Sequence, residues 1–186
     1  PSSITYPLDE VRAFIGMDLV FCNTGPMALA LAMWMGVKEV WLFGTRTADV
    51  YYNSGNALFP FEPIPGALLD QGIAAVDSAA AFDHTVVWLG QNREGQAIVW
   101  KAQGYTPVRI STHALEEAMQ GYSTIADARA WVYQDAGHAF YVLNFPTAGA
   151  CWVYDASTQL WHERGYWDPN DMTWEAYRPS CHVWAW

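Results

Sequence analysis

The stretch Trp131–Gly165, WVYQDAGHAFYVLNFPTAGACWVYDASTQLWHERG, decides the fold that we expect for this chain. In and around it, four short runs rich in aromatic and β-branched residues alternate with turn-forming segments. The runs are Ala130–Gln134, His138–Phe145, Cys151–Tyr154 and Gln159–Arg164. Such alternation is typical of antiparallel strands joined by hairpins. Four strands in about 35 residues is the size of one β-propeller blade, so the stretch predicts an all-β fold of that kind.

Two earlier stretches show the same kind of pattern. Their strand-like runs are Val40–Phe43 and Asp49–Tyr52 in the first, then His84–Gly90, Ala97–Trp100 and Tyr105–Ile110 in the second. Repetition of a strand-rich unit at a spacing of several tens of residues is the signature of a propeller. We therefore predict a β-propeller, or about three blades of a larger one, with one or two short helices inserted.

The first tryptophan of each stretch gives the register of the repeat. Aligning the stretches in this way brings together Trp41, Trp88, Trp131 and Trp184, which lie 43 to 53 residues apart. This spacing fits blades that differ in loop length. We expect Trp41, Trp88 and Trp131 to occupy equivalent strands of successive sheets and to be largely buried.

Segments outside these runs give weaker patterns. Three prolines within Phe59–Gly66 predict an extended loop rather than a ladder strand, because proline has no N–H to donate. The Ala-rich residues 67–82 fit either a helical turn or a buried strand. His113–Gln120 follows Thr112 and precedes Gly121, and it has Leu115 and Met119 on one face, so it predicts a short amphipathic helix.

The beginning of the chain does not follow the repeat. Leu19–Asn23 resembles a strand, and Pro26–Val37 has the composition of a buried helix that is too short to span a bilayer. We therefore divide the chain into a poorly defined initial segment, residues 1–37, and propeller blades, residues 38–186. Because the chain starts at Pro1 and stops in the strand-like His182–Trp186, we expect it to be part of a longer protein.

Composition excludes several classes of protein. With 52% hydrophobic and 15% charged residues the chain is globular, and its 11 Trp, 10 Tyr and 8 Phe favour β structure. A net charge of −10 with two lysines does not fit a protein that grips nucleic acid strongly. The three cysteines Cys22, Cys151 and Cys181 form no C-x-x-C pair, so we expect reduced thiols in a protein that folds in a cytoplasm.

Two groups of residues superficially resemble chemical sites. His113–Glu117 places His and Glu on a helix, but it lacks the second His of a zinc motif, so we expect a solvated helix face. The other histidines, His84, His138, His162 and His182, follow no ligand spacing. Asp155–Thr158 sets a carboxylate beside hydroxyls with no His nearby in sequence, which favours a turn over a nucleophile.

A third group suggests sugar chemistry. It combines carboxylates with tryptophans, namely Asp135, Asp155, Glu163 and Asp168 with Trp152, Trp161 and Trp167. Glycosidases need two carboxyls at a defined separation, which sequence alone does not show. The tryptophans follow the repeat, so we favour blade packing. The chain also has no P-loop, no dinucleotide-binding motif and no nucleophile elbow. We predict no catalytic, cofactor-binding or metal-binding residue.

Three long segments, Glu39–Gly66, Thr85–Ala118 and Gly137–Gly165, resemble the packaged-DNA stabilisation proteins of short-tailed phages, also called tail accessory or tail hub proteins. The resemblance extends over about residues 38–167. It implies a propeller-bearing subunit of a multi-copy hub that lies beneath the portal and adaptor rings and above the tail needle. There the hub closes the DNA exit channel after packaging.

The resemblance also implies where the protein acts and with what. We expect a virion tail protein, assembled in the host cytoplasm, that forms a homo-oligomeric ring. Its partners would be the portal or adaptor and the tail needle or tail tip, with double-stranded DNA nearby but no sequence-specific binding, no membrane and no cofactor. It would not be an enzyme. Two alternatives remain open, a carbohydrate-binding or carbohydrate-cleaving propeller and a general protein-interaction propeller.

Overall fold

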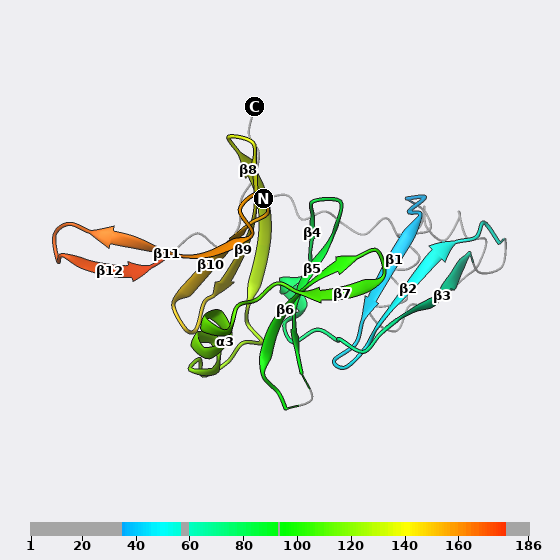
Figure 1. Cartoon of the computed structure of the whole chain (residues 1–186), viewed down its shortest axis with the longest axis horizontal. Helices are drawn as coiled ribbons and strands as arrows, with labels where there is room; N and C mark the ends of the chain where they lie inside the picture. Colours follow the sequence, from blue (N-terminus) through cyan, green and yellow to red (C-terminus); the bar gives the residue numbers. More distant parts are fainter. Residues whose placement is uncertain (1–34, 57–59, 93, 178–186) are drawn as a thin grey trace, which may run out of the picture. The chain divides into compact units, whose positions relative to one another are not determined.

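The computed structural model describes residues 35–56, 60–92 and 94–177. Within these ranges the chain is almost entirely β, with three sheets of three, four and five strands (Figure 1). The all-β, blade-like fold predicted from the sequence is thus confirmed. The expectations for Leu19–Asn23, for most of Pro26–Val37 and for Trp184 lie outside the described residues.

The strands follow one another in space as they do in sequence, apart from short helical insertions. The first sheet has the order β1-β2-β3, the second β4-β5-β6-β7 and the third β12-β11-β10-β9-β8. Their bounds are β1 Glu39–Phe43, β2 Ala48–Asn53, β3 Phe61–Leu69, β4 Ala80–Phe82, β5 Thr85–Gln91, β6 Ala97–Gln103, β7 Thr106–Arg109, β8 Arg129–Asp135, β9 His138–Phe145, β10 Ala150–Asp155, β11 Leu160–Asp168 and β12 Thr173–Ala176. A 3₁₀ turn, η1 (Val76–Ser78), precedes the second sheet, and helix α3 (His113–Gln120) follows it.

The described chain falls into two compact units. The larger contains Phe43–Asp49 and the chain from Gly66 onward, and the smaller contains the described residues up to Leu42 and between Val50 and Pro65. The larger unit therefore holds the complete second and third sheets and helix α3. The boundary between residues 37 and 38 that we expected remains a prediction.

The second and third sheets share one apolar core. Alternate residues of β5, β6, β9 and β10 supply it, together with Phe82 of β4 and two residues of the helix. The largest are Phe82, Leu89, Leu115, Met119, Tyr141, Leu143, Phe145 and Tyr154. Phe82 of β4 lies against both Tyr141 and Tyr154, with ring centroids 6.1 Å apart in each pair. Burial of alternate apolar residues on two facing sheets is the main source of stability in such a structure.

A buried serine joins the two sheets through hydrogen bonds. Ser78 is fully buried and its Oγ accepts a bond of 3.0 Å from the Leu89 N–H while donating one of 2.6 Å to the Ala75 carbonyl. The Ser78 carbonyl in turn accepts a 2.8 Å bond from the hydroxyl of Tyr141 on β9. Because the Ser78 hydroxyl, the Ser78 carbonyl and the Tyr141 hydroxyl each have a partner, burial of these groups carries little penalty.

The prediction of a loop at Phe59–Gly66 is wrong, since β3 runs through Pro63 and Pro65. The physical reason is the position of β3 at the edge of its sheet. Pro63 and Pro65 are two residues apart, so both missing N–H groups belong to the same side of the strand. An edge strand has one side without a partner strand, and a missing N–H on that side breaks no ladder hydrogen bond, which makes proline tolerable in β3. The Ala-rich residues 67–82 contain both predicted features, the turn η1 and the short strand β4.

The predicted equivalence of the tryptophans is also wrong. Trp41 lies on β1 and Trp131 on β8, each the first strand of its sheet, whereas Trp88 lies on β5, the second strand. The sequence interpretation started the second blade one strand late, at His84, because it left residues 67–82 undecided between a helical turn and a buried strand. Only Trp88 is fully buried, while Trp41 and Trp131 are half-buried. Phe43 packs against Trp88 with ring centroids 5.2 Å apart.

Replacing Trp88 with alanine should lower the free energy of unfolding by about 3–5 kcal/mol, because it leaves a large cavity on a packed sheet face. Trp174 is 71% exposed and provides a matched control. Its replacement should cost less than about 1 kcal/mol. Denaturant unfolding of the full chain measures both values. A loss below about 1 kcal/mol for Trp88→Ala would contradict its assignment to the core.

Candidate functional site

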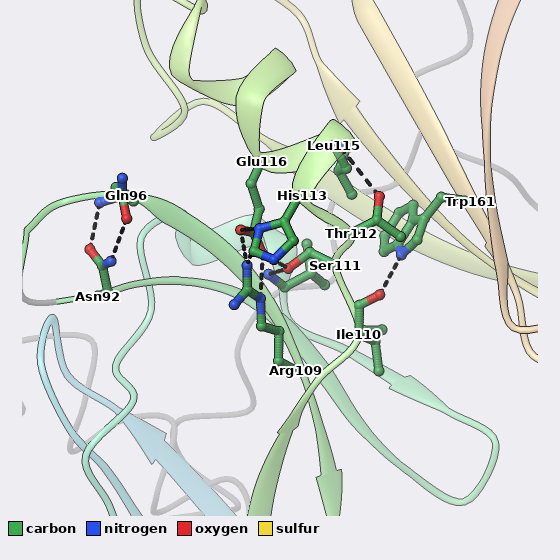
Figure 2. A network of polar contacts seen from close by, with 11 residues as sticks. Asn92, Gln96, Arg109, Ile110, Ser111, Thr112, His113, Leu115, Glu116 and Trp161 are labelled. Carbon is green, nitrogen blue, oxygen red and sulfur yellow. Dashed lines mark hydrogen bonds and ion pairs between the residues drawn. The ribbon is translucent and has the colours of Figure 1, made fainter.

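Polar side chains gather at the start of helix α3, next to strand β7 (Figure 2). Thr112 caps the helix, since its hydroxyl accepts a 3.3 Å bond from the Leu115 N–H. Leu115 and Met119 on one helix face are both buried, as their four-residue spacing predicts. The predicted helix is thus confirmed with the bounds His113–Gln120.

Glu116 is the centre of this network. Its carboxylate accepts bonds from Arg109 Nε at 2.6 Å and from the Ser111 hydroxyl at 2.5 Å, and it forms an ion pair with Arg109 Nη2. Ser111 Oγ also accepts a 3.1 Å bond from the Val99 N–H of β6. A planar guanidinium that binds both carboxylate oxygens fixes the pair geometrically. The network therefore fastens helix α3 to the second sheet.

The expectation of a solvated face for His113–Glu117 is only partly right. The side chain of His113 is 93% exposed and Glu117 is exposed, but Glu116 is buried. The sequence suggested burial of a carboxylate only indirectly, through Arg109 seven residues earlier. His113 Nδ1 lies 3.2 Å from Arg109 Nη2, beside a cation rather than in a set of metal ligands.

A second polar cluster forms at the ends of β9 and β10. Asp155 is buried, with Oδ2 2.8 Å from His138 Nδ1, while Oδ1 accepts a 2.8 Å bond from the Ser157 N–H. The Thr158 hydroxyl donates to Oδ2 at 3.1 Å. Burial raises the pKa of Asp155, but the bonds from Ser157, His138 and Thr158 outweigh it and hold the pKa below its ordinary value of 3.8.

This cluster brings together an aspartate and a histidine that are far apart in the sequence. Acid–base catalysis through a nucleophile requires the histidine to face a hydroxyl on its other side. Here Ser157 contacts Asp155 through its backbone, and the Thr158 hydroxyl donates to the carboxylate itself. The contacts are those of a turn, in agreement with the expectation for Asp155–Thr158. An open hollow of about 580 Å³ adjoins them, lined by residues that include Asp83, Asp135 and His138.

The tryptophans considered as sugar platforms divide into two kinds. Trp161 packs against Tyr154 with ring centroids 5.3 Å apart, and its Nε1 donates a 2.8 Å bond to the Ile110 carbonyl. Trp152 Nε1 donates to the Tyr122 hydroxyl at 2.9 Å, and the ring packs on the main core. Both serve blade packing, as we favoured. Trp167 is different, because it is 44% exposed.

Trp167 belongs to a hairpin that the sequence did not predict. We expected the fourth strand of the third blade to end at Gly165, but β11 continues to Asp168 and pairs with β12. The signal available in the sequence was Tyr166-Trp167 before a turn and Trp174 after it. At the turn, carboxylate oxygens of Asp168, Asp171 and Glu175 all lie within 4.8 Å of one another.

The cysteines and the other histidines singled out in the sequence do not belong to either polar cluster where the structure describes them. Cys151 is a buried free thiol on β10, and burial raises its pKa to about 11 despite the opposing effect of Arg164. Such a thiol is unreactive at neutral pH, as expected of a structural cysteine. His84 lies in the turn before β5 and His162 on β11. Cys22, Cys181 and His182 lie outside the described residues.

Comparison with known proteins shows which family the chain resembles. The family model described as Bacteriophage P22 Gp10, beta-propeller, matches residues 28–184. The match therefore covers all three sheets and also the end of the initial segment. No curated protein matches the chain. In the part of the chain that the structure describes, no helix has the length and apolar character needed to cross a membrane.

Replacing Glu116 with alanine should lower the free energy of unfolding by about 2–3 kcal/mol, because Arg109 and Ser111 lose a charged partner in a partly buried place. Glu117→Ala, one residue away and exposed, should change it by less than about 0.5 kcal/mol. Denaturant unfolding of both variants makes the comparison. Equal effects of the two substitutions would show that the Glu116 network does not stabilise the fold.

The low pKa of Asp155 predicts a specific dependence of stability on pH. Because the pKa is lower in the folded state, the charged group stabilises the fold at neutral pH, and that stabilisation disappears as pH falls through the folded pKa. Asp155→Asn should therefore unfold at a lower temperature than wild type at neutral pH, with the difference shrinking below about pH 4. Thermal unfolding across this range tests it. A difference that is independent of pH would contradict the prediction.

Proposed function

Because this chain belongs to the family described as Bacteriophage P22 Gp10, beta-propeller, whose members are phage DNA-stabilisation proteins, we propose that it is a tail hub subunit. It would plug the channel of the portal and adaptor rings and retain the packaged genome. Membership of this family identifies the chain as a structural phage protein. The observation that carries the proposal is the match over residues 28–184, which includes every described sheet.

The chemistry of the chain supports a mechanical role. The two polar clusters described above stabilise the fold: Glu116 links helix α3 to the second sheet, and Asp155 accepts the hydrogen bonds that close a turn. Retention of DNA needs a stiff obstacle rather than base recognition. Sheets packed through a shared core supply stiffness, because close-packed interiors have low compressibility. We propose on this basis that the protein has no catalytic activity.

The net negative charge of the chain supports a role as a barrier that does not bind tightly to the packaged DNA. The chain carries 19 acidic and 9 basic residues, for a net charge of −10. Binding to the phosphate backbone depends on neutralisation by Lys and Arg. An acidic ring would repel the duplex and leave it free to exit when the channel opens. Double-stranded DNA is thus a neighbour of the protein in this proposal and not a specific ligand.

Assembly into a ring of identical copies completes the proposal. Each described sheet ends in two edge strands, and edge strands expose N–H and C=O groups that need to be covered or protected. A ring around the tail channel, in contact with portal or adaptor proteins and with the tail needle or tip, would supply neighbours. The protein would then reside in the virion tail after assembly in the host cytoplasm.

Phage particles that lack this protein should package DNA and then lose it, while receptor binding by their tail fibres or spikes remains intact. Measuring the DNA content of particles at intervals after packaging tests this. Particles complemented with the wild-type protein are the control and should keep their genome. If particles without the protein keep their DNA but fail to bind or digest host polysaccharide, the carbohydrate-active alternative would replace the tail hub.

A further inference from the structure

Strand β11 belongs to two pairings along its length. Its first half, Leu160–Arg164, pairs with β10 inside the third sheet. Its second half, Gly165–Asp168, pairs with β12. The β11–β12 hairpin consequently projects from the body of that sheet (Figure 1). We call the segment Gly165–Ala176 the arm.

The two faces of the arm differ in character. Trp167 and Trp174 are directly opposed across the strands and lie on one face, with ring centroids 5.7 Å apart. The small residues Gly165 and Ala176, also opposed, share this face because side chains alternate along a strand. A Cβ on Gly165 would lie 2.9 Å from the Trp174 ring. Because glycine has no side chain, this ring can pack directly against the backbone at Gly165. This face is aromatic, and the Tyr166–Glu175 pair lies on the other.

The aromatic face is open to solvent. Trp174 is 71% exposed, Met172 at the turn 73% and Trp167 44%. Among the described residues, Trp167 and Trp174 are the tryptophans whose side chains are strongly exposed. Exposed apolar patches on soluble proteins mark interaction sites, and Trp is enriched where a few residues supply most of the binding energy. An isolated two-stranded hairpin is marginally stable in water, so a partner would also order the arm.

Charge indicates which kind of partner fits. Between Gly165 and Tyr177 the chain has Asp168, Asp171 and Glu175 and no Lys or Arg. A second copy of this chain is a poor match, because the chain has a net charge of −10 and nine Lys and Arg residues in all. Three of these cations, Lys101, Arg109 and Arg164, are already engaged by Asp83, by Glu116 and by the Tyr133 ring. Like charges across an interface oppose binding.

We propose that the arm is the docking element for a different protein of the phage particle, one that has an apolar groove rimmed by Lys and Arg. The groove takes up Trp167 and Trp174, and the rim pairs with the acidic turn. This inference rests on the proposed function for placing the partner in the particle. It assigns the contact to one twelve-residue segment, Gly165–Ala176.

Site-specific cross-linking in assembled particles tests the proposal. A photoreactive benzoyl-phenylalanine replaces Trp174 in the full chain, particles are purified and irradiated, and mass spectrometry identifies the attached peptides. The expected adduct joins position 174 to a different particle protein near Lys or Arg residues. The same probe at Val76, which is 81% exposed on η1, is the matched control and should not give this adduct. Attachment of the Trp174 probe to a second copy, or to no protein, would overturn the inference.

Variants of the arm test the two parts of the interface separately. Trp167→Ser with Trp174→Ser should weaken binding to the cross-linked partner by at least about tenfold, whereas Leu68→Ser with Val76→Ser should not. The double variant Asp168→Asn with Asp171→Asn should lose less of its affinity for the cross-linked partner than wild type does when NaCl is raised. Thermal unfolding confirms that each variant folds. Unchanged affinity in the tryptophan variant would overturn the inference.

The outcomes separate this inference from the tail hub proposal. If the chain is present in particles that retain their DNA, but the Trp174 probe gives no adduct to another protein, only the docking inference fails. If the chain is absent from purified particles, both proposals fail.

Discussion

The burial of one face of the second sheet against one face of the third is the interaction on which the rest of the structure depends. Leu89 and Val99 from one side meet Tyr141, Leu143 and Phe145 from the other. Strand β4 is three residues long and would be unstable alone, but Phe82 lies between Tyr141 and Tyr154 in this core. Helix α3, with eight residues, is also too short to be stable alone, and it is held by Leu115 and Met119 in the same core and by the ion pair of Glu116 with Arg109. Removal of the shared core would leave two isolated sheets with exposed apolar faces.

The polar groups of the described chain are arranged around this core and fasten it. Ser78 connects the turn before β4 to β5 and β9, Trp161 binds the Ile110 carbonyl, and Asp155 closes the turn between β10 and β11. Each of these bonds joins segments that packing has already brought together, so each adds rigidity. A rigid, acidic phage protein whose buried polar groups hold structure fits a mechanical role in the particle better than chemistry on a substrate. Among the tryptophans that the structure describes, the strongly exposed ones, Trp167 and Trp174, both lie on the arm, the part of the third sheet that projects from this body.

The sequence predicted the elements whose signals are local. The bounds of β9 and α3 follow from turn residues and periodicity, and the number of sheets follows from the repeat. It failed where the tertiary environment decides. Proline is tolerated in β3 because that strand is an edge. Strand β4 remained undecided from the sequence because its turn, Asp83-His84, has positive φ without the glycine or asparagine that usually marks such a turn. The burial of Glu116 and the pairing of β11 with β12 depend on partners that no short window of sequence reveals.

An image of the intact phage particle at a resolution that separates β-sheets tests the central claim, that this chain is a rigid structural subunit of the tail, most directly. The account predicts that its three sheets fit density repeated around the axis below the portal, with the third sheet's arm reaching density that belongs to another protein. Density for the chain in the fibres or spikes that contact the host surface, or its complete absence from the particle, would contradict the account.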